Sequence, residues 1–267
     1  FQWYPGHMTK AKRMMQENIK LIDLVIELVD ARVPMSSRNP DIDELGKNKA
    51  RLILLNKADL ADEKQTEEWI GYFRGKGYSA VKVNSRKGGG IKSIQGVIQE
   101  ACKEKTERDR KRGILNRPVR AMVVGIPNVG KSTFINALAG KACAKTGNEE
   151  LLDTPGILWP KFEDQQVGLR LAFIGSIKDE IMNLEELAAE LISFMQDAYP
   201  GVLAEKYTIN EKQNSYSVLE AIAESRHCLV RGNELDTAKA AGMLLDDFRN
   251  GRLGRITLEF VKEYTNE

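Results

Sequence analysis

The segment at residues 125–132 has residue types and spacing that suit the binding of phosphate groups. It reads GIPNVGKS and is called the phosphate loop below. Its glycines let backbone N–H groups turn inward around phosphate oxygens, where a side chain would not fit. Lys131 would neutralise the β- and γ-phosphates of a nucleotide, and the Ser132 hydroxyl would bind Mg²⁺. The residues that we expect to contact the phosphates are Asn128, Val129, Gly130, Lys131, Ser132 and Thr133.

A second segment, the base box at residues 56–59, could bind a purine base. It reads NKAD and precedes the phosphate loop in the chain. The Asp59 carboxylate can accept hydrogen bonds from N1–H and the exocyclic amine of guanine, a pair that adenine lacks, and such charge-assisted bonds contribute about 1.5–3 kcal/mol each. We expect Lys57 to pack its stem over the base and Asn56 to tether the loop, so that GTP and GDP are selected. The alternative is an ordinary turn, which Asn and Asp also favour.

A weaker candidate for base contact lies at residues 84–88, which read NSRKG. The segment follows the next apolar run after the base box. We expect Asn84, Ser85 and Arg86 to form a second guanine-binding loop, and a simple turn is the alternative.

Residues 153–156 read DTPG and match a segment that responds to the γ-phosphate. Asp153 would hold Mg²⁺ through a water molecule, and the Gly156 N–H would contact the γ-phosphate. An ordinary turn is the alternative. The next residue is Ile157, whose aliphatic side chain cannot orient an attacking water molecule by hydrogen bonding. A catalytic group must therefore come from elsewhere, or hydrolysis is slow.

An alternating series of strands and helices must position these segments. Short apolar, β-branched runs have the composition of buried parallel strands. They lie at residues 24–29, 51–55, 80–83 and 120–124. Amphipathic stretches at residues 66–74 and 91–104 are long enough for crossover helices, and another helix should run over residues 132–138. The predicted fold class is α/β, with a doubly wound, mostly parallel sheet.

After residue 156 the pattern changes to helices only. We expect them at about residues 183–198, 215–229 and 236–250. The chain should therefore contain two domains. The first, residues 1–175, begins with an N-terminal arm and helix at residues 1–20, and the second, residues 176–267, is smaller and helical.

The stretch between Lys131 and Asp153 is short for its expected content. A helix, a loop carrying a Thr for Mg²⁺ and an additional strand should fit there, but only residues 140–150 remain after the helix. We therefore predict that a segment near residues 147–150 is missing from this chain, so that the Thr cannot be assigned.

Composition argues against membrane and disulfide-dependent classes. No apolar run approaches the roughly 18 residues that a membrane span needs. Cys102, Cys143 and Cys228 form no Cys-x-x-Cys pair, which argues against a disulfide framework or a zinc site. A reducing, cytoplasmic location fits these features best.

The net charge of +2 hides an asymmetry between the two parts of the chain. Residues 1–117 carry 24 Lys and Arg against 16 Asp and Glu, whereas residues 118–267 carry 16 against 22. A polyanion should be drawn to the first part, where residues 103–112 are the densest basic stretch. The alternative for that stretch is a solvated helix end. In the acidic second part, RNA contact would need a local patch of Arg249, Arg252 and Arg255, for which a solvated helix end is again the alternative.

The order of base box, second base loop, phosphate loop and DTPG segment resembles the circularly permuted GTPases. Residues 3–8, WYPGHM, and the helical C-terminal region are similar to bacterial members that act in ribosome assembly. The resemblance implies a cytoplasmic GTPase that binds GTP/GDP and Mg²⁺ and acts late in assembly of the large ribosomal subunit. The implied partners are that subunit, its rRNA and ribosomal proteins, with no membrane or DNA role and a monomeric state away from the ribosome.

The same resemblance nominates His7 as the catalytic residue. In this family a hydrophobic residue replaces the catalytic Gln, as Ile157 does here, and the N-terminal Pro-Gly-His segment is held to orient the water molecule. A neutral imidazole suits that role near neutral pH. The alternative is that His7 is a turn residue before the helix that begins near Thr9.

Asn128 resembles an Asn that helps to hold K⁺ in potassium-stimulated GTPases. A K⁺ ion beside the phosphates would neutralise charge that develops in the transition state. The alternative is that Asn128 is only a loop residue tolerant of the turn.

Two other functions compete with a hydrolysing GTPase. One is a GTP-dependent binding scaffold in which Ile157 signifies negligible hydrolysis. The other is a small-molecule kinase that shares the phosphate loop, against which Asp59 and the DTPG segment argue.

Overall fold

The computed structural model describes residues 5–115, 117–142, 149–153 and 164–265, and the chain divides into two units. The first unit comprises residues 1–163 and 259–267, and the second comprises residues 164–258. The predicted domain boundary between residues 175 and 176 is therefore wrong. Residues 164–175 belong to the helical unit, and the last residues of the chain return to the first unit because Glu259 and Tyr264 pack there.

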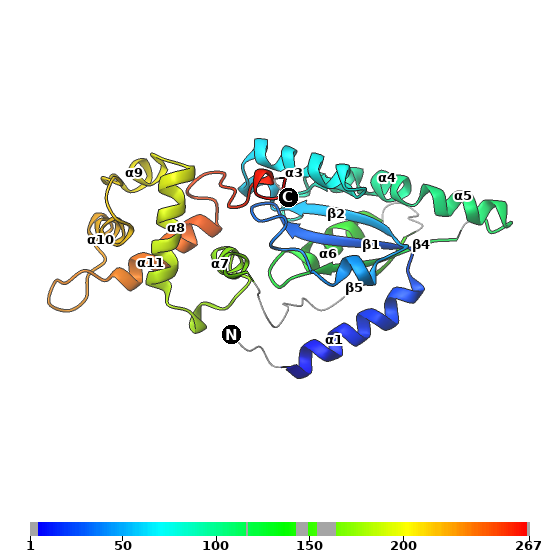
Figure 1. Cartoon of the computed structure of the whole chain (residues 1–267), viewed down its shortest axis with the longest axis horizontal. Helices are drawn as coiled ribbons and strands as arrows, with labels where there is room; N and C mark the ends of the chain where they lie inside the picture. Colours follow the sequence, from blue (N-terminus) through cyan, green and yellow to red (C-terminus); the bar gives the residue numbers. More distant parts are fainter. Residues whose placement is uncertain (1–4, 116, 143–148, 154–163, 266–267) are drawn as a thin grey trace. The chain divides into compact units, whose positions relative to one another are not determined.

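A parallel sheet of five strands forms the centre of the first unit (Figure 1). The strands are β1 (Leu24–Asp30), β2 (Ala50–Asn56), β3 (Ser79–Lys82), β4 (Val119–Gly125) and β5 (Glu149–Asp153). They lie in the order β3-β2-β1-β4-β5, and every strand pair among the described residues is parallel. Strand β1 is buried along its whole length, as a central strand covered on both faces must be. The predicted doubly wound parallel sheet is confirmed.

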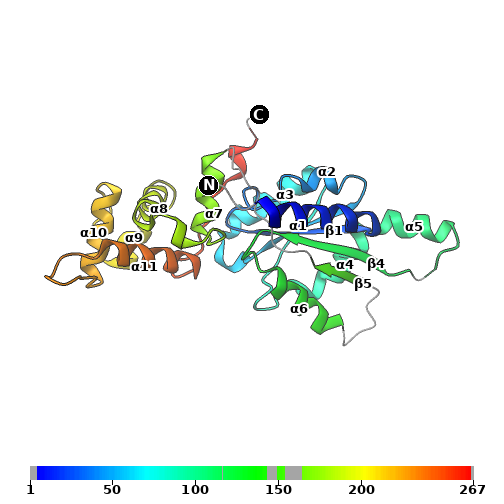
Figure 2. The ribbon, with the colours of Figure 1, turned by 90° about the horizontal axis from the view of Figure 1, so that it is seen from below.

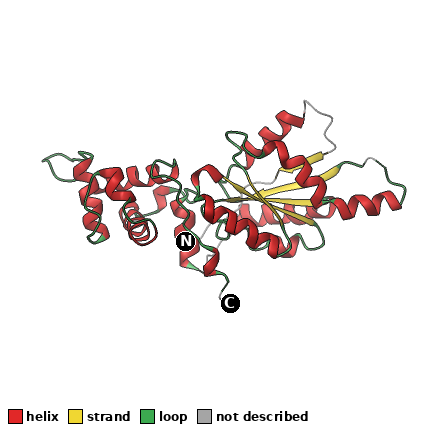
Figure 3. Ribbon diagram, turned by 90° about the horizontal axis from the view of Figure 1, so that it is seen from above, coloured by secondary structure: helices red, strands yellow, loops and turns green. Residues whose placement is uncertain are grey.

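Helices cover both faces of the sheet (Figures 2 and 3). On one face lie α1 (Pro5–Asn18), where Met15 packs with Val25, and α3 (Glu63–Gly75), where Trp69 packs with Val29. Val25 and Val29 share this face because alternate strand residues point to the same side. The other face is covered by α4 (Ile91–Ala101) and α6 (Lys131–Ala142), which contact β2 and β4.

The amphipathic stretch at residues 91–104 forms two helices, so the expectation of a single helix is wrong. Helix α4 buries Ile91, Ile94 and Ile98, whereas α5 (Lys103–Lys111) buries no residue. The apolar periodicity stops at Cys102. Helix α4 therefore ends where its buried face ends, and a separate polar helix follows. The short helix α2 (Ile42–Leu45) completes the α-helices described in the first unit.

The second unit is helical in its described residues, as predicted, apart from one isolated antiparallel bridge between Leu229 and Leu235. Its helices are α7 (Gln165–Phe173), α8 (Leu184–Ala198), α9 (Val202–Tyr207), α10 (Ser215–Ser225) and α11 (Thr237–Arg249). Asn183, Asn214 and Asp236 cap α8, α10 and α11 by accepting hydrogen bonds from backbone N–H groups of the first turn. No described helix of the chain is both long and apolar enough to cross a membrane.

Helix α10 ends earlier than the expected residue 229 because the backbone turns left-handed at His227. This residue has a φ of 53°. The N–H of Cys228 donates to the carbonyl of Ala223 at 2.8 Å, and the N–H of His227 donates to the carbonyl of Glu224 at 3.1 Å. These two bonds form a Schellman motif, which usually contains Gly at the left-handed position.

Glu259 packs its buried carboxylate against the loop that follows β1. Glu259 is fully buried. Its side chain accepts hydrogen bonds from the N–H of Met35 at 2.5 Å, the N–H and hydroxyl of Ser36, and the Tyr264 hydroxyl at 3.0 Å. The Trp69 indole donates to the Glu259 carbonyl at 2.9 Å. The C-terminal residues therefore hold the β1 loop and α3 together.

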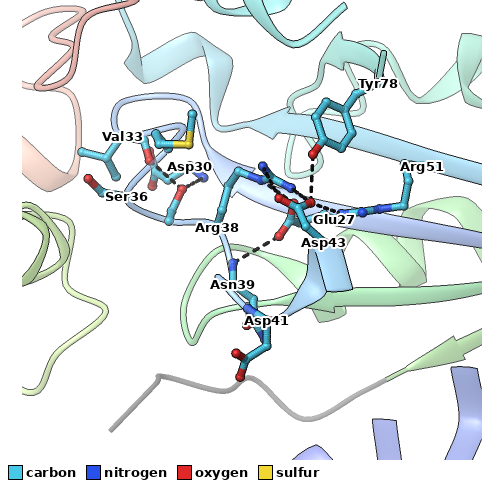
Figure 4. A network of polar contacts seen from close by, with 12 residues as sticks. Glu27, Asp30, Val33, Ser36, Arg38, Asn39, Asp41, Asp43, Arg51 and Tyr78 are labelled. Atoms are coloured by element: carbon cyan, nitrogen blue, oxygen red, sulfur yellow. Dashed lines mark hydrogen bonds and ion pairs between the residues drawn. The ribbon is translucent and has the colours of Figure 1, made fainter. Parts of the chain in front are cut away.

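A network of buried and half-buried charges anchors the same loop to the sheet (Figure 4). The Arg38 guanidinium lies 2.7 Å from Glu27 of β1 and 2.7 Å from Asp43. Asp43 also accepts hydrogen bonds from Arg51 at 3.0 Å and from the Tyr78 hydroxyl at 2.9 Å. Burial raises the pKa of Glu27, and the adjacent Arg38 opposes that rise. The network links the loop to β1, β2 and the start of β3.

Replacing Glu259 by Ala should destabilise the first unit. The substitution leaves the N–H groups of Met35 and Ser36 and the Ser36 hydroxyl without this acceptor in a buried region. Each unsatisfied buried donor costs about 1–3 kcal/mol, so we expect the loss of the acceptor for three donors to lower the free energy of unfolding by about 3 kcal/mol or more. Urea unfolding followed by far-UV circular dichroism measures this change.

The matched control is Glu68→Ala, which removes an exposed carboxylate from α3. We expect that variant to stay within about 0.5 kcal/mol of the unaltered protein. Equal stability of the two variants would contradict the proposed structural role of Glu259.

Candidate functional site

The base box and the phosphate loop meet at the carboxyl edge of the sheet. Strand β1 lies between the strands that carry them, with Asp30 opposite Asn56 of β2 and Leu28 opposite Gly125 of β4. In a parallel sheet the carboxyl ends of adjacent strands share one edge, where α/β proteins bind their ligands. The two segments are therefore neighbours although the base box comes first in the chain.

Asn56 joins three loops at this edge. Its side-chain NH₂ donates to the Val129 carbonyl of the phosphate loop at 2.9 Å. Its side-chain oxygen accepts hydrogen bonds from the N–H of Ser85 at 3.1 Å and from the Ser85 hydroxyl at 2.9 Å. Asn56 is 2% exposed and Ser85 4% exposed, so these bonds lie away from bulk water. One amide thus fixes the base box, the second base loop and the phosphate loop relative to one another.

Gly130 allows Asn56 to approach the phosphate loop. Its φ is 96°, and a Cβ at this position would lie 2.5 Å from the Asn56 side-chain nitrogen. A residue with a Cβ would clash with the Asn56 side chain and would be strained at this φ, so the loop or Asn56 would have to move. Asn128 also has a left-handed backbone, with a φ of 63°, which Asn tolerates better than most residues. The loop geometry therefore depends on its second glycine for a specific steric reason.

Lys57 makes a second connection between the two segments. Its ammonium donates to the Asn128 carbonyl at 2.7 Å and lies 3.9 Å from the Asp30 carboxylate. Its backbone is left-handed, with a φ of 55°. Burial lowers the pKa of Lys57, and the nearby Asp30 opposes that effect. The Lys57 side chain is half-buried, and the packing of its stem over a base stays a prediction.

Asp30 and Arg32 are site residues that the sequence analysis missed. Arg32 binds both carboxylate oxygens of Asp30, at 2.9 and 2.8 Å, and both residues are at most 1% exposed. Burial alone would raise the pKa of Asp30, but the Arg32 guanidinium and the Lys57 ammonium hold it below its usual value. Asp30 ends a buried strand at the same edge as the base box, and a carboxylate at that position could have been predicted from the sequence to lie at the site.

Asp59 lies at the rim of the edge, in a short 3₁₀ turn at Ala58–Leu60. Its carboxylate pairs with the Lys87 ammonium at 3.3 Å, and the Lys87 side chain is 72% exposed. Such surface pairs contribute little and exchange readily with other partners. The Asp59 oxygens are therefore accessible to donors from a base.

The second base loop is organised differently from its prediction. Ser85 is turned inward to Asn56, whereas Arg86 is exposed. The side-chain oxygen of Asn84 accepts a hydrogen bond from the N–H of Lys87 at 3.2 Å. Ser85 therefore acts through Asn56, while direct base contact by Asn84 and Arg86 stays a prediction.

The phosphate-binding residues lie where β4 passes into α6. Lys131 begins the helix, and the side chains of Ser132 and Thr133 are exposed. Asp153 ends β5 opposite Val123 of β4, so its backbone lies one strand away from the phosphate loop. Hydroxyl and carboxylate oxygens are ligands that suit Mg²⁺, and a helix N-terminus attracts anions. The donor set thus fits a magnesium–nucleotide complex.

Several predicted residues lie outside the described part of the chain. They include Gly156 and Ile157, and the backbone of His7 lies in α1 while its side chain is not described. The predicted missing segment near residues 147–150 falls partly there too. Glu149 and Glu150 begin β5.

Two residues of the predicted local RNA patch, Arg249 at the end of α11 and Arg252 beyond it, have acidic partners within the helical unit, and RNA contact by the patch stays a prediction. Arg249 forms bonds of 2.8 Å with both Asp179 oxygens and donates to the carbonyls of Phe173 and Ala172. Arg252 pairs with Asp247 at 3.2 Å. Arg249 therefore ties α11 to the end of α7 within the helical unit.

Comparison with known proteins agrees with this geometry. A family model described as "50S ribosome-binding GTPase" matches residues 120–150, which include the phosphate loop. Ribosome biogenesis GTPase A of Bacillus cereus is 49% identical over 280 residues, covering 98% of this chain and 95% of the relative. The same protein of Priestia megaterium is 45% identical, with 98% and 97% covered.

A solved structure has the same architecture. The GDP-bound structure of YlqF gives a TM-score of 0.70 at 25% identity, covering 94% of this chain and all of that one. The B. cereus alignment is also longer than this chain of 267 residues, so the relative has residues without a counterpart here. The permuted order of the two binding segments on one parallel sheet and the extent of these matches lead to one conclusion. The chain belongs to the ribosome biogenesis GTPase A family.

Proposed function

We propose that this protein binds and hydrolyses GTP while it acts on the large ribosomal subunit during assembly, with turnover stimulated by the particle and by K⁺. The observation that carries the proposal is the Asn56 bridge. Asn56 belongs to the base box. It bonds to Ser85 of the second base loop and to Val129 of the phosphate loop, so it connects the segments suited to guanine with the one suited to phosphates. A nucleotide that occupies both loops would bind across one rigid edge.

Guanine selectivity would arise at Asp59. Its carboxylate, at the rim of the sheet edge, would give up its ion pair with the Lys87 ammonium, 3.3 Å away. It would then accept hydrogen bonds from the N1–H and the exocyclic amine of the base. Lys57 would cover the base with its stem while its ammonium stays bonded to the Asn128 carbonyl. Adenine would leave the carboxylate without these donors, and unpaired polar groups make such discrimination strong.

Phosphate binding would use the backbone of the phosphate loop and the N-terminus of α6. Lys131 and the loop N–H groups would neutralise the phosphate oxygens, and Gly156 would contact the γ-phosphate. Mg²⁺, held by Ser132 and through water by Asp153, would supply further charge neutralisation. These residues act mainly by positioning and electrostatics, which dominate phosphoryl transfer.

Hydrolysis requires a group that orients the attacking water molecule, and Ile157 cannot do so. His7 is the proposed substitute, and α1, which contains it, belongs to the same unit as the phosphate loop. A GTP-dependent scaffold with negligible hydrolysis is the second candidate, favoured by Ile157. We propose a cytoplasmic location and a monomeric state away from the ribosome for either function.

Replacing Asp59 by Asn should weaken GTP and GDP binding by about a hundredfold or more, since two charge-assisted bonds are lost. The same change should improve binding of xanthosine nucleotides, because the Asn amide can donate to the carbonyl that replaces the guanine amine. Titration with fluorescent guanosine and xanthosine diphosphates measures both effects.

The control is Asp62→Asn, which makes the same chemical change at the N-cap of α3. The Asp62 carboxylate accepts a hydrogen bond from the N–H of Lys64 at 3.0 Å. Asn caps helices as well as Asp does, so nucleotide affinity should not change. If Asp59→Asn kept the original affinity and selectivity, the base box would not read guanine.

His7→Ala should lower large-subunit-stimulated GTP turnover by about tenfold or more, because general acid–base groups contribute at least this much. GTP affinity should stay the same. Multiple-turnover phosphate release in the presence of purified large subunits measures the rate.

His227→Gly is the control for the His7 experiment. It removes the chain's other histidine and keeps the left-handed turn. Unchanged turnover in His7→Ala would remove His7 from the mechanism. Negligible turnover of the unaltered protein, with subunits bound in a GTP-dependent way, would favour the scaffold instead.

Turnover should be about tenfold faster in KCl than in NaCl at equal ionic strength, since a fixed cation stabilises the transition-state charge. Asn128→Gly removes the side-chain amide but keeps the left-handed backbone, and it should abolish the difference between the two salts. Equal rates of the unaltered protein in both salts would refute the K⁺ role.

A further inference from the structure

Helix α5 has no structural role in any hydrophobic core. It spans Lys103–Lys111 and buries none of its residues. Figures 1 and 2 show it projecting beyond the sheet at the end where the strands begin. A helix this short and polar on all sides is marginal by itself in water. Its position therefore depends on polar contacts with the body of the first unit.

Those contacts converge on Asp23, which immediately precedes β1. Lys105 lies 3.3 Å from Asp23 and 3.0 Å from Asp109 of its own helix. Arg117, beyond the end of α5, lies 3.5 Å from Asp23. The Asp23 side chain is only 7% exposed, so the pair with Lys105 is better shielded than a surface ion pair. One face of α5 is thus fixed to the sheet.

The basic side chains at the C-terminal end of α5, unlike Lys105, are not fixed to the sheet. Residues 108–112 read RDRKR, and the four basic side chains are all exposed. Within the described part of the chain, none of the four forms an ion pair or donates a side-chain hydrogen bond. The C-terminus of a helix favours one or two cations, but four in five residues create a concentrated positive potential. We call residues 108–112 the basic tip.

The chemistry of the basic tip suits the phosphate groups of RNA. Arg and Lys both carry a full positive charge at neutral pH and donate hydrogen bonds to phosphate oxygens. The five residues of the basic tip span only about 6 Å along the helix axis, but their four long side chains point in different directions around the axis and can meet more than one phosphate. Residues 1–117, which include α5, carry 24 Lys and Arg against 16 Asp and Glu, so the tip belongs to a part of the chain with net positive charge, which favours a polyanion.

We propose that the basic tip of α5 binds the sugar–phosphate backbone of RNA, at the sheet edge opposite the nucleotide site. This inference rests on the proposed action on ribosomal particles and identifies one of the contact surfaces. Because Asp23 and Asp30 lie at opposite ends of β1, the surface is separate from the guanine and phosphate loops. It binds RNA in a sequence-independent way, and its contribution depends strongly on salt.

The test compares two variants of equal charge by their affinity for large-subunit RNA in the full-length protein. In the tip variant, glutamine replaces Arg108, Arg110, Lys111 and Arg112. In the control variant, glutamine replaces four exposed lysines of other elements, Lys47, Lys64, Lys76 and Lys92. Filter binding across a range of KCl concentrations gives the dissociation constant and its salt dependence.

The tip variant should bind RNA about tenfold more weakly at physiological salt and show a salt slope lower by about 2 to 3, whereas the control should change little. A third variant, with Lys at positions 108, 110 and 112, should keep affinity within about threefold, because backbone contact depends mainly on charge. GTP affinity should be the same in all of them.

Equal RNA binding by the tip and control variants would overturn the assignment to α5 while leaving the proposed function intact. Failure of the unaltered protein to bind RNA or large subunits would overturn both. If the tip variant lost affinity for subunits but not for RNA, the tip would contact a ribosomal protein and the proposal would be wrong.

Discussion

The Asn56 side chain is the contact on which the nucleotide site depends. Its amide bonds to Ser85 after the adjacent strand β3 and to the Val129 carbonyl after β4, which lies beyond β1, and the bonds are buried away from bulk water. The loops that contain both partners follow β3 and β4, strands that the parallel sheet holds in register with β2 and β1. A buried amide in this position does more than bind a ligand: it sets the distance between a base-reading loop and a phosphate-reading loop, so a nucleotide would bind with little ordering cost.

Charge is used around this bridge to hold loops in place. Asp30 is paired with Arg32 and lies near Lys57, while Glu259 receives N–H and hydroxyl donors from the loop after β1. Breaking one member of such a buried set leaves the others uncompensated, which makes these groups costly to lose. The loop that begins at Asp30 is therefore held at its start by the contacts of Asp30 with Arg32 and Lys57, and further along, at Ser36, by Glu259.

The sequence was sufficient to predict the elements whose signal is local. Buried strands, the helix after Ser132 and the base and phosphate loops all follow from composition and spacing within short windows. What it did not predict depends on contacts between distant residues or on unusual backbone. The inward turn of Ser85 requires Asn56, the end of α10 requires a left-handed His227, and Glu259 has no sequence feature that distinguishes it from a surface carboxylate.

The return of residues 259–267 to the first unit also constrains the order of folding. A ribosome delivers the chain from its N-terminus, so Trp69, Met35 and Ser36 emerge long before Glu259 and Tyr264 can reach them. The helical unit, by contrast, is continuous from residue 164 to 258 and can complete its core without later segments. The nucleotide-binding unit should thus mature after the helical unit, because the packing around Trp69 of α3 is incomplete until Glu259 and Tyr264 have left the exit tunnel.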